Sequence, residues 1–292
     1  MLPKGRVFLP HAGDGDMEPV LDNHLHLDPV NGRGAEAAAE FARAGGTHLL
    51  VLNKPSWSLV GEVEGPDGFR EAFELTVDVT AEADDHLPGR AWPVLGVHPA
   101  LISKLTERGY TPEEARELMC TGLDVAAEFV ADGPAVAIKS GRPHYDVDGA
   151  VWDASNAVMR HAFGLGAEVG CPVQLHTEGG DDFTEVAAWA EEEGLPAGQV
   201  VKHYSEGPVA GPVPSVIARK DGLEAAAESG EPFLMETDFI DDPDRPGAVL
   251  GPKTVPRRVA WLREQGYEEA VHRAHVETPA AVYGIDTERT LD

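Results

Sequence analysis

Short runs of aliphatic and β-branched residues alternate along the chain with longer segments rich in alanine and glutamate. Apolar runs bounded by polar residues or glycine are typical of buried strands, and they predict strands within residues 19–28, 47–54, 91–99, 135–140, 171–180, 199–207, 214–220 and 232–239. Amphipathic stretches between them predict helices, among them 34–46, 111–133, 151–169 and the closing 254–284. Thr111 and Glu114 have the spacing of a capping box.

This alternation gives about eight strand–helix pairs in 292 residues. A (β/α)8 barrel has eight such pairs and typically about 250 residues. The sequence therefore predicts an α/β fold, a TIM barrel with its site at the C-terminal ends of the strands. An open doubly wound sheet is the alternative, but no glycine-rich phosphate loop follows the first predicted strand. Because no repeat or low-complexity linker interrupts the pattern, we expect one domain over residues 1–292.

The charge of the chain is strongly acidic, with 23 Lys and Arg against 51 Asp and Glu and a formal net charge of −28. Such a field repels phosphate, which argues against non-specific binding to nucleic acid or to an anionic membrane. An acidic surface poor in lysine also suits a halophilic protein. In molar salt the Debye length shrinks to about 3 Å, so the charge would then say little about partners.

Other sequence features indicate a cytoplasmic protein with no membrane association. Cys120 and Cys171 fit no metal or redox spacing and form no disulfide framework. No stretch approaches the ~20 apolar residues of a membrane span. The N-terminal segment has neither an apolar core nor a small-residue cleavage site, so we expect no leader sequence.

Strongly polar residues end most of the predicted strands. In a parallel barrel the C-terminal strand ends converge on one face, so these side chains are expected to meet there: His24, His26, Lys139, His176, His203 and Asp238. Any one histidine could be a core or loop residue, and Asp238 alone could cap a helix. Together, imidazoles and a carboxylate without thiolates favour a divalent metal, zinc first, with manganese, cobalt or nickel as alternatives.

Several stretches resemble the TatD-like metal-dependent hydrolases of the amidohydrolase superfamily: "DNHLHLD" (22–28), "VLGVHP" (94–99), "VQLHTE" (173–178), "VVKHYS" (200–205), "METDF" (235–239) and "VETPAAVYGID" (276–286). "GRPHY" (141–145) is similar to an archaeal branch of that family. The resemblance implies a barrel that binds one or two divalent metals. By position, His24, His26 and Asp238 would hold the more buried metal, and His176 and His203 the more exposed one.

Lys139 departs from the family pattern, because it stands where TatD proteins have a glutamate that bridges the metals. A cationic ammonium there would repel two dications strongly. Either the second metal is absent, or Lys139 points elsewhere or binds an anionic substrate, or it carries CO2 as a carbamate. We favour the carbamate, which other amidohydrolases use at this strand position and which burial promotes by exposing the neutral amine.

The expected reaction is hydrolysis by a metal-activated water, with Asp238 as the proton acceptor. For a small-molecule substrate, we expect contacts from Arg142, His144 and Tyr145 after the fourth strand and from His98 after the third, with Lys54 and Trp57 as further wall residues. Arg142 could equally hold its own loop through a salt bridge. An ester, lactone, amide or phosphoester hydrolase ranks first, a TatD-type deoxyribonuclease acting as a 3′-exonuclease second, and a non-catalytic metal-binding protein third. The oligomeric state does not follow from the sequence.

Overall fold

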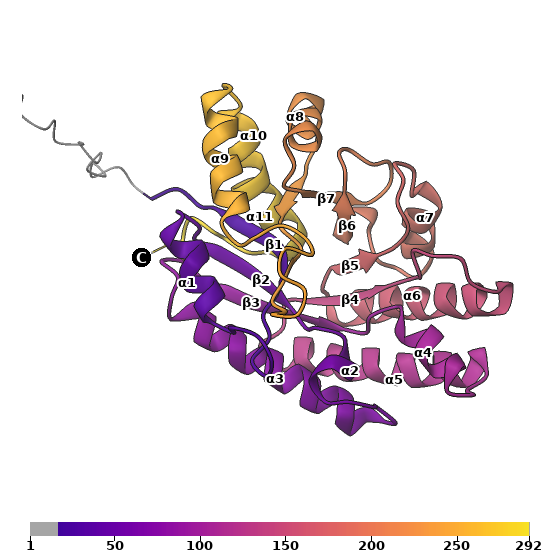
Figure 1. Cartoon of the computed structure of the whole chain (residues 1–292). Helices are drawn as coiled ribbons and strands as arrows, with labels where there is room; N and C mark the ends of the chain where they lie inside the picture. The colour runs from indigo at the N-terminus through magenta and orange to yellow at the C-terminus, as the bar shows by residue number, and fades with distance from the viewer. Residues whose placement is uncertain (1–16, 292) are drawn as a thin grey trace, which may run out of the picture.

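One parallel sheet of nine strands forms the centre of the computed structural model, which describes residues 17–291 (Figure 1). The strands are β1 Leu21–His26, β2 His48–Leu52, β3 Ala91–Gly96, β4 Ala137–Gly141, β5 Val173–His176, β6 Val200–Ser205, β7 Val213–Ile217, β8 Leu234–Glu236 and β9 Phe239–Ile240. Each of the eight predicted strand segments overlaps one of β1 to β8, although β4 ends one residue after its segment and β7 begins one residue before its segment. The expected absence of a leader sequence concerns residues 1–16, which lie outside the described range.

The sheet curls until its first and last strands meet. Its order is β8-β7-β6-β5-β4-β3-β2-β1-β9, and β9 follows β8 after only Thr237 and Asp238. Phe239 pairs with Leu25, and the Asp238 backbone N–H donates to the carbonyl of His24 at 2.9 Å. The predicted (β/α)8 TIM barrel is thereby confirmed, and an open doubly wound sheet is excluded.

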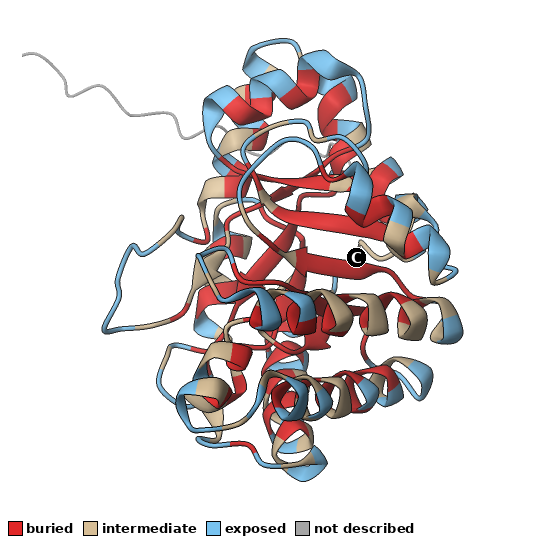
Figure 2. Ribbon diagram, turned by 90° about the vertical axis from the view of Figure 1, so that its right-hand side faces the viewer, coloured by how far each residue is buried: buried red, intermediate tan, exposed pale blue. Residues whose placement is uncertain are grey.

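Helices cover the outside of the barrel, and Figure 2 shows buried strands with exposed residues on the outer helix faces. They are α1 Glu36–Arg43, α2 Ser56–Leu59, α3 Pro66–Asp84, α4 Leu101–Glu107, α5 Pro112–Ala131, α6 Gly149–Val169, α7 Thr184–Glu192, a 3-10 turn Ala197–Gln199, α8 Lys220–Ser229, α9 Thr254–Glu264, α10 Glu268–His272, a π-helical turn Arg273–Glu277 and α11 Thr278–Tyr283. Within residues 17–291 none of these helices has the length and apolarity needed to cross a bilayer.

The start of α5 shows why local sequence determines the helix ends. The Glu114 N–H donates to Thr111 Oγ1 at 3.2 Å, and the Thr111 N–H donates to Glu114 Oε2 at 2.8 Å. These two bonds satisfy N–H groups that the helix itself leaves unpaired. The predicted capping box is therefore confirmed.

Close strand packing at the top of the barrel depends on glycine. A Cβ atom added to Gly141, at the end of β4, would lie 1.9 Å from the carbonyl oxygen of His176, and Gly141 has a φ of +147°. Only glycine combines this approach with this backbone conformation. The contact draws the ends of β4 and β5 together, and these strands carry Lys139 and His176.

Candidate metal centre

The histidines of β1 and the aspartate that precedes β9 meet at the C-terminal end of the barrel. His24 and His26 point to the same side of β1 because they are two residues apart. Their Nε2 atoms lie 3.9 and 3.8 Å from Asp238 Oδ1, and one ligand atom from each of the three residues falls within 4.8 Å of the other two. All three side chains are largely withdrawn from solvent. The sequence-predicted buried triad is thus brought together.

The other two predicted histidines extend this cluster. The ring of His203 stacks on that of His24 with 3.7 Å between centroids, and the ring of His176 lies 5.3 Å from that of His203. Lys139 is only 2 % exposed. Its ammonium lies close enough to lower the pKa values of His24 and His26, to which burial makes the larger contribution. All six predicted ligands therefore share one small volume.

Hydrogen bonds fix which nitrogen of each β1 histidine is free. His24 Nδ1 lies 2.8 Å from Gln174 Oε1, and His26 Nδ1 donates to the carbonyl oxygen of Leu52 at 3.0 Å. The amide nitrogen of Gln174 donates to the carbonyl of Asn23 at 3.2 Å, so Oε1 is the atom that accepts from His24. In both rings Nδ1 carries the proton, and Nε2 offers its lone pair to the centre.

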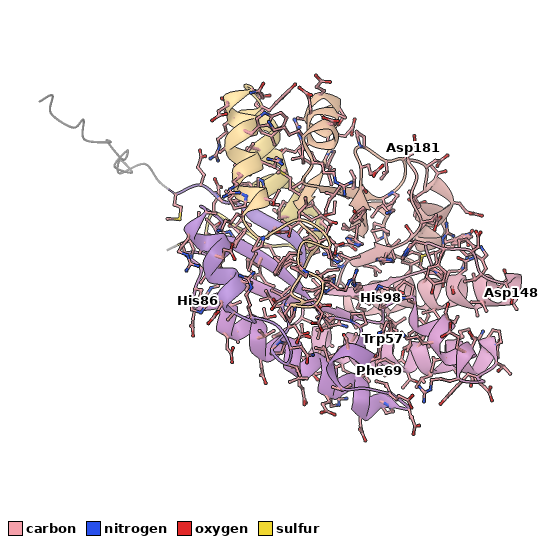
Figure 3. The ribbon with its side chains drawn as sticks, in the orientation of Figure 1. Trp57, Phe69, His86, His98, Asp148 and Asp181 are labelled. Atoms are coloured by element: carbon pink, nitrogen blue, oxygen red, sulfur yellow. The ribbon has the colours of Figure 1, made fainter. Side chains whose placement is uncertain are left out.

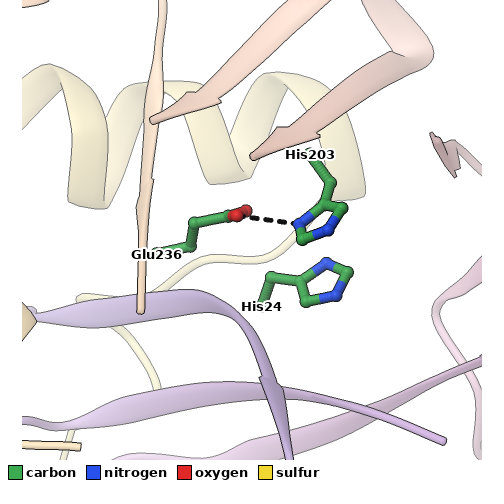
Figure 4. Close-up of side chains that lie close together, drawn as sticks. All are labelled: His24, His203 and Glu236. Atoms are coloured by element: carbon green, nitrogen blue, oxygen red, sulfur yellow. Dashed lines mark hydrogen bonds and ion pairs between the residues drawn. The ribbon is translucent and has the colours of Figure 1, made fainter. Parts of the chain in front are cut away.

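Glu236, which the sequence interpretation missed, performs the same task for His203. Its Oε1 atom accepts from His203 Nδ1 at 2.8 Å, drawn in Figure 4, and from the Tyr204 N–H at 2.9 Å. Ser215 Oγ donates to the other carboxylate oxygen. Glu236 could also form a metal-binding group with His24 and His203. Because both of its oxygens already accept hydrogen bonds, its role here is to orient His203.

The donor set fits a divalent metal ion. Burial lowers the pKa values of His24, His26, His176 and His203 far below that of a free histidine, so the imidazoles are neutral. The Nε2 atom of His24 is buried without a hydrogen-bond partner. A buried unpaired acceptor is costly unless something outside the protein satisfies it. Neutral imidazole nitrogens beside a carboxylate are ligands that zinc and similar ions take.

The backbone around Asp238 is held by a buried carboxyl from β1. Asp22 Oδ1 accepts from the Thr237 N–H at 3.0 Å and Oδ2 from Thr237 Oγ1 at 2.6 Å. Asp238 has a φ of 47°, in the left-handed region that non-glycine residues rarely adopt. Burial raises the pKa of Asp22 to about 7, although the bonds from Thr237 lower it. Asp22 thus stabilises the strained turn that presents Asp238.

Arg142, predicted as a substrate contact, is paired within the protein. Its Nε donates to Glu178 Oε2 at 2.8 Å, Nη1 donates to Asn156 Oδ1 at 3.2 Å, and the guanidinium lies 4.5 Å from the ring centroid of Trp152. These contacts match the salt-bridge interpretation. They hold the loop after β4 to the loop after β5, so a substrate would compete with Glu178 for the guanidinium.

The other predicted substrate residues lie at the rim of the centre. His144 Nδ1 is 2.9 Å from His176 Nε2, and the ring of His98 lies 4.7 Å from that of His176. Trp57 packs edge-on against His98 at 5.8 Å, and both are labelled in Figure 3. Tyr145 is 40 % exposed and bonds Ser103. His98 and His144 are thus brought to the centre, and Tyr145 remains near its edge.

Lys54 forms an internal ion pair. Its Nζ donates to Asp28 Oδ2 at 2.6 Å and to the carbonyl of Asp241 at 3.3 Å. The Asp241 carboxylate in turn accepts N–H bonds from Arg33 and Gly34. Lys54 therefore ties the loop after β1 to the segment after β9.

A cavity of about 850 Å³ opens beside the centre. His176, His203 and Asp238 form part of its wall, and residues 177–181 after β5, Tyr204 near the end of β6 and residues 206–209 after β6 form most of the rest. Lys202 also lines it, a residue that the sequence interpretation passed over. A cavity of this size holds a small organic molecule.

A closed parallel barrel with histidines and a carboxylate at its C-terminal strand ends defines the class of the metal-dependent hydrolase barrels. The chain belongs to the TatD family, since the family model described as "TatD related DNase" matches residues 21–284. The protein is therefore a hydrolase of the metal-dependent kind, as the sequence predicts, and the third alternative of a non-catalytic protein is not supported. Family membership likewise implies divalent metal ions.

A curated relative and several solved structures are similar to this chain. An uncharacterized protein of Methanocaldococcus jannaschii is 36 % identical over 283 residues, which cover 92 % of this chain and 97 % of the relative. A TatD-like protein from Archaeoglobus fulgidus has a TM-score of 0.56 at 16 % identity, covering 87 % of this chain and 95 % of its own. An organophosphorus hydrolase from Deinococcus radiodurans scores 0.57 at 16 % identity, covering 91 % and 92 %. A lactonase from Listeria monocytogenes scores 0.55 at 13 % identity, covering 92 % and 95 %. These three structures share the fold.

Proposed function

We propose that the protein hydrolyses an ester, lactone, amide or phosphoester bond at a binuclear metal centre bridged by carboxylated Lys139. The observation that carries this proposal is the burial of Lys139 among four histidines without an ion pair to any carboxylate of the described residues. A buried ammonium without a partner is costly, and close to bound dications it would be more so.

Carboxylation removes this cost. Burial lowers the pKa of Lys139, an effect that the charges of Asp238 and Glu236 oppose in part. The neutral amine nitrogen would attack the carbon of CO2. An N–C bond forms, one C=O π bond opens to leave a negative oxygen, and one N–H proton leaves to solvent. The product is a lysine carbamate, an anion with two oxygens like the side chain of glutamate. TatD proteins, which this chain resembles, have a glutamate at the position of Lys139.

Each ligand has a defined task in the proposal. His24, His26 and Asp238 would hold the more buried metal, His176 and His203 the more exposed one, and the Lys139 carbamate would lie between them. Bound divalent ions, zinc first, supply a Lewis acid and lower the pKa of the attacking water. The Asp238 carboxylate accepts the proton of that water and passes it to the leaving group. Without metal, burial raises the pKa of Asp238 to about 7, and the charge of Lys139 opposes this.

The bond type is the open part of the proposal. Solved structures of the same fold include an organophosphorus hydrolase and a lactonase, which supports testing phosphoesters and lactones first. The second candidate is a deoxyribonuclease, favoured by the description of the family model. The net charge of −28 opposes a nucleic-acid groove, so we rank a small-molecule substrate higher.

The test combines metal content with activity. Purified protein is analysed for bound metals and assayed with chromogenic phosphate, ester, lactone and amide substrates and with single-stranded DNA bearing a free 3′ end. Turnover of a small substrate without nucleotide release supports the first candidate, and the reverse result supports the second. Two bound metals without turnover of any substrate would contradict both.

Substitutions at Lys139 test the bridge. We expect Lys139→Met to lose one of two metals and Lys139→Glu to retain much of both, because a glutamate supplies the same bridging oxygens. Metal analysis of the two variants measures this. A crystal structure with both metals bound and Lys139 ending at a bare Nζ would refute the carbamate.

A further inference from the structure

Four cationic side chains are buried in the part of the chain that the structure describes, namely Lys54, Lys139, Arg142 and Lys202. Lys54 and Arg142 form ion pairs with Asp28 and Glu178. Lys139 belongs to the metal centre. Lys202 is thus a buried cation outside that centre with no carboxylate partner, in a chain with more than two acidic residues for each basic one. An uncompensated buried charge is costly to stability and therefore points to a role in function.

The ammonium of Lys202, a residue in the middle of β6, lies beside the cavity. Its side chain is 2 % exposed and lines the 850 Å³ cavity together with the loops after β5 and β6. Nζ donates to the carbonyl oxygen of the adjacent His203 at 2.6 Å and lies 5.3 Å from the ring centroid of Phe183. A lysine has three N–H donors, so this single hydrogen bond leaves two of them available.

The nearest carboxylates are already engaged. The negative charges of Glu178 and Glu236 are close enough to interact with Lys202, but neither carboxylate forms an ion pair with its Nζ atom. Glu178 is paired instead with Arg142. Glu236 accepts hydrogen bonds from His203, Tyr204 and Ser215. Tyr204, two residues after Lys202, also lines the cavity and has a φ of 55°. Strained residues are retained where they position a functional surface.

We propose that Lys202 binds an oxyanion of the substrate, a carboxylate or phosphate group that lies in the cavity a few bonds from the scissile bond. This inference rests on the proposed hydrolase function and specifies its substrate class as anionic. Because Lys202 and His203 both line the cavity, the ammonium of Lys202 and the metal centre would hold the two ends of one small molecule. The negative group would supply the counter-charge that the protein itself does not provide.

Matched substrates test the proposal by charge. 4-Nitrophenyl butyrate is compared with 4-nitrophenyl hydrogen succinate, which ends in a carboxylate, and 4-nitrophenyl acetate with 4-nitrophenyl phosphonoacetate, which adds a phosphonate a few bonds from the scissile ester bond. Lys202→Met is expected to raise KM for an anionic substrate about tenfold or more, the value of a charge-assisted hydrogen bond, and to leave the neutral substrates unchanged. Lys202→Arg should restore part of the difference. The substrate pair that responds identifies carboxylate or phosphate as the group, whereas equal effects on neutral and anionic substrates overturn the proposal.

Binding measurements separate this inference from the hydrolase proposal. Isothermal titration calorimetry of the metal-loaded protein with succinate and with inorganic phosphate needs no turnover. We expect Lys202→Met to weaken one of them about tenfold, while Lys220→Met, which removes the same charge from the exposed start of α8, should not. The melting temperature of Lys202→Met should not fall, because a buried unpaired charge is removed. Unchanged anion affinity in Lys202→Met would overturn the proposal even if the enzyme is active.

Discussion

Each β1 histidine has its Nδ1 atom engaged by the protein itself, so only Nε2 is free for a metal. Gln174 performs this function for His24 and the carbonyl of Leu52 for His26. Such outer hydrogen bonds fix the tautomer and the ring orientation before a metal binds. The amide of Gln174 is held in turn by Tyr283 at 2.9 Å, so α11 takes part in setting the geometry of the centre.

Gln174 allows a direct test of this arrangement. Gln174→Leu removes the acceptor for His24 Nδ1 and should weaken metal affinity by about 10–100-fold, the usual effect of losing such a partner. Gln174→Glu retains an acceptor oxygen and should retain most of the affinity. Competition with a chelating dye measures both variants. Equal metal affinities for the Gln174→Leu variant and the unmodified protein would show that His24 needs no partner.

A substitution at Asp238 provides the second test at the scale of single residues. Asp238→Asn keeps an oxygen for the metal but cannot accept a proton, so metal content should be retained while kcat falls by about 10²–10⁴-fold. Steady-state kinetics and metal analysis of the same preparation measure the two effects separately. An unchanged kcat would exclude Asp238 as the base.

At the scale of elements, periodicity identified the strands because each apolar run ends where the chain leaves the barrel wall. The six predicted ligands follow from that rule. Gln174 and Glu236 were missed although each lies two residues before a predicted ligand, and Gln174 points to the same side of β5 as His176. A polar residue inside an apolar run does not reveal its partners, which come from strands distant in sequence. The two-residue β9 and the short helix α4 were likewise unpredicted, because their length gives no periodicity.

The C-terminal π-helical turn makes a testable contact with β1. His275 Nδ1 accepts the Leu21 N–H at 3.0 Å, and burial lowers the pKa of His275 to about 3. In the unfolded chain His275 has a pKa near 6.5, so as the pH falls it takes up a proton there before it does so in the folded protein. The contribution of His275 to the free energy of unfolding is therefore complete above that pH and is lost as the pH falls toward 3. Between about pH 7 and about pH 5 the loss from this residue should be about 2 kcal/mol.

Urea unfolding at the two pH values measures the effect. His275→Gln cannot titrate, so its free energy of unfolding should decline less over the same range than that of the unmodified protein. The other histidines are common to both proteins and cancel in the comparison. Parallel pH profiles for the two proteins would refute the assignment.

At the scale of the whole molecule, the formal net charge can be counted from the sequence alone, and folding does not change that count. A net charge of −28 opposes compaction through self-repulsion, which salt screens. We therefore propose that the protein is adapted to high salt. The urea concentration at the midpoint of unfolding should rise steadily as KCl is raised from about 0.1 M to about 3 M. Circular dichroism at constant temperature follows the unfolding. Full stability in dilute buffer would contradict halophilic adaptation.

The join between β1 and β9 also has a consequence for biosynthesis. Asp238 donates to the carbonyl of His24, and the preceding Thr237 donates to Asp22, both more than two hundred positions earlier in the sequence. A nascent chain that has left the ribosome only as far as β7 has the four predicted ligand histidines but lacks the carboxylate of Asp238 and the strand that closes the barrel. Contacts so distant in sequence form late, because a long loop must first be ordered. Hydrolytic activity therefore begins only when nearly all of the barrel has been translated, and incomplete chains are expected to be inert.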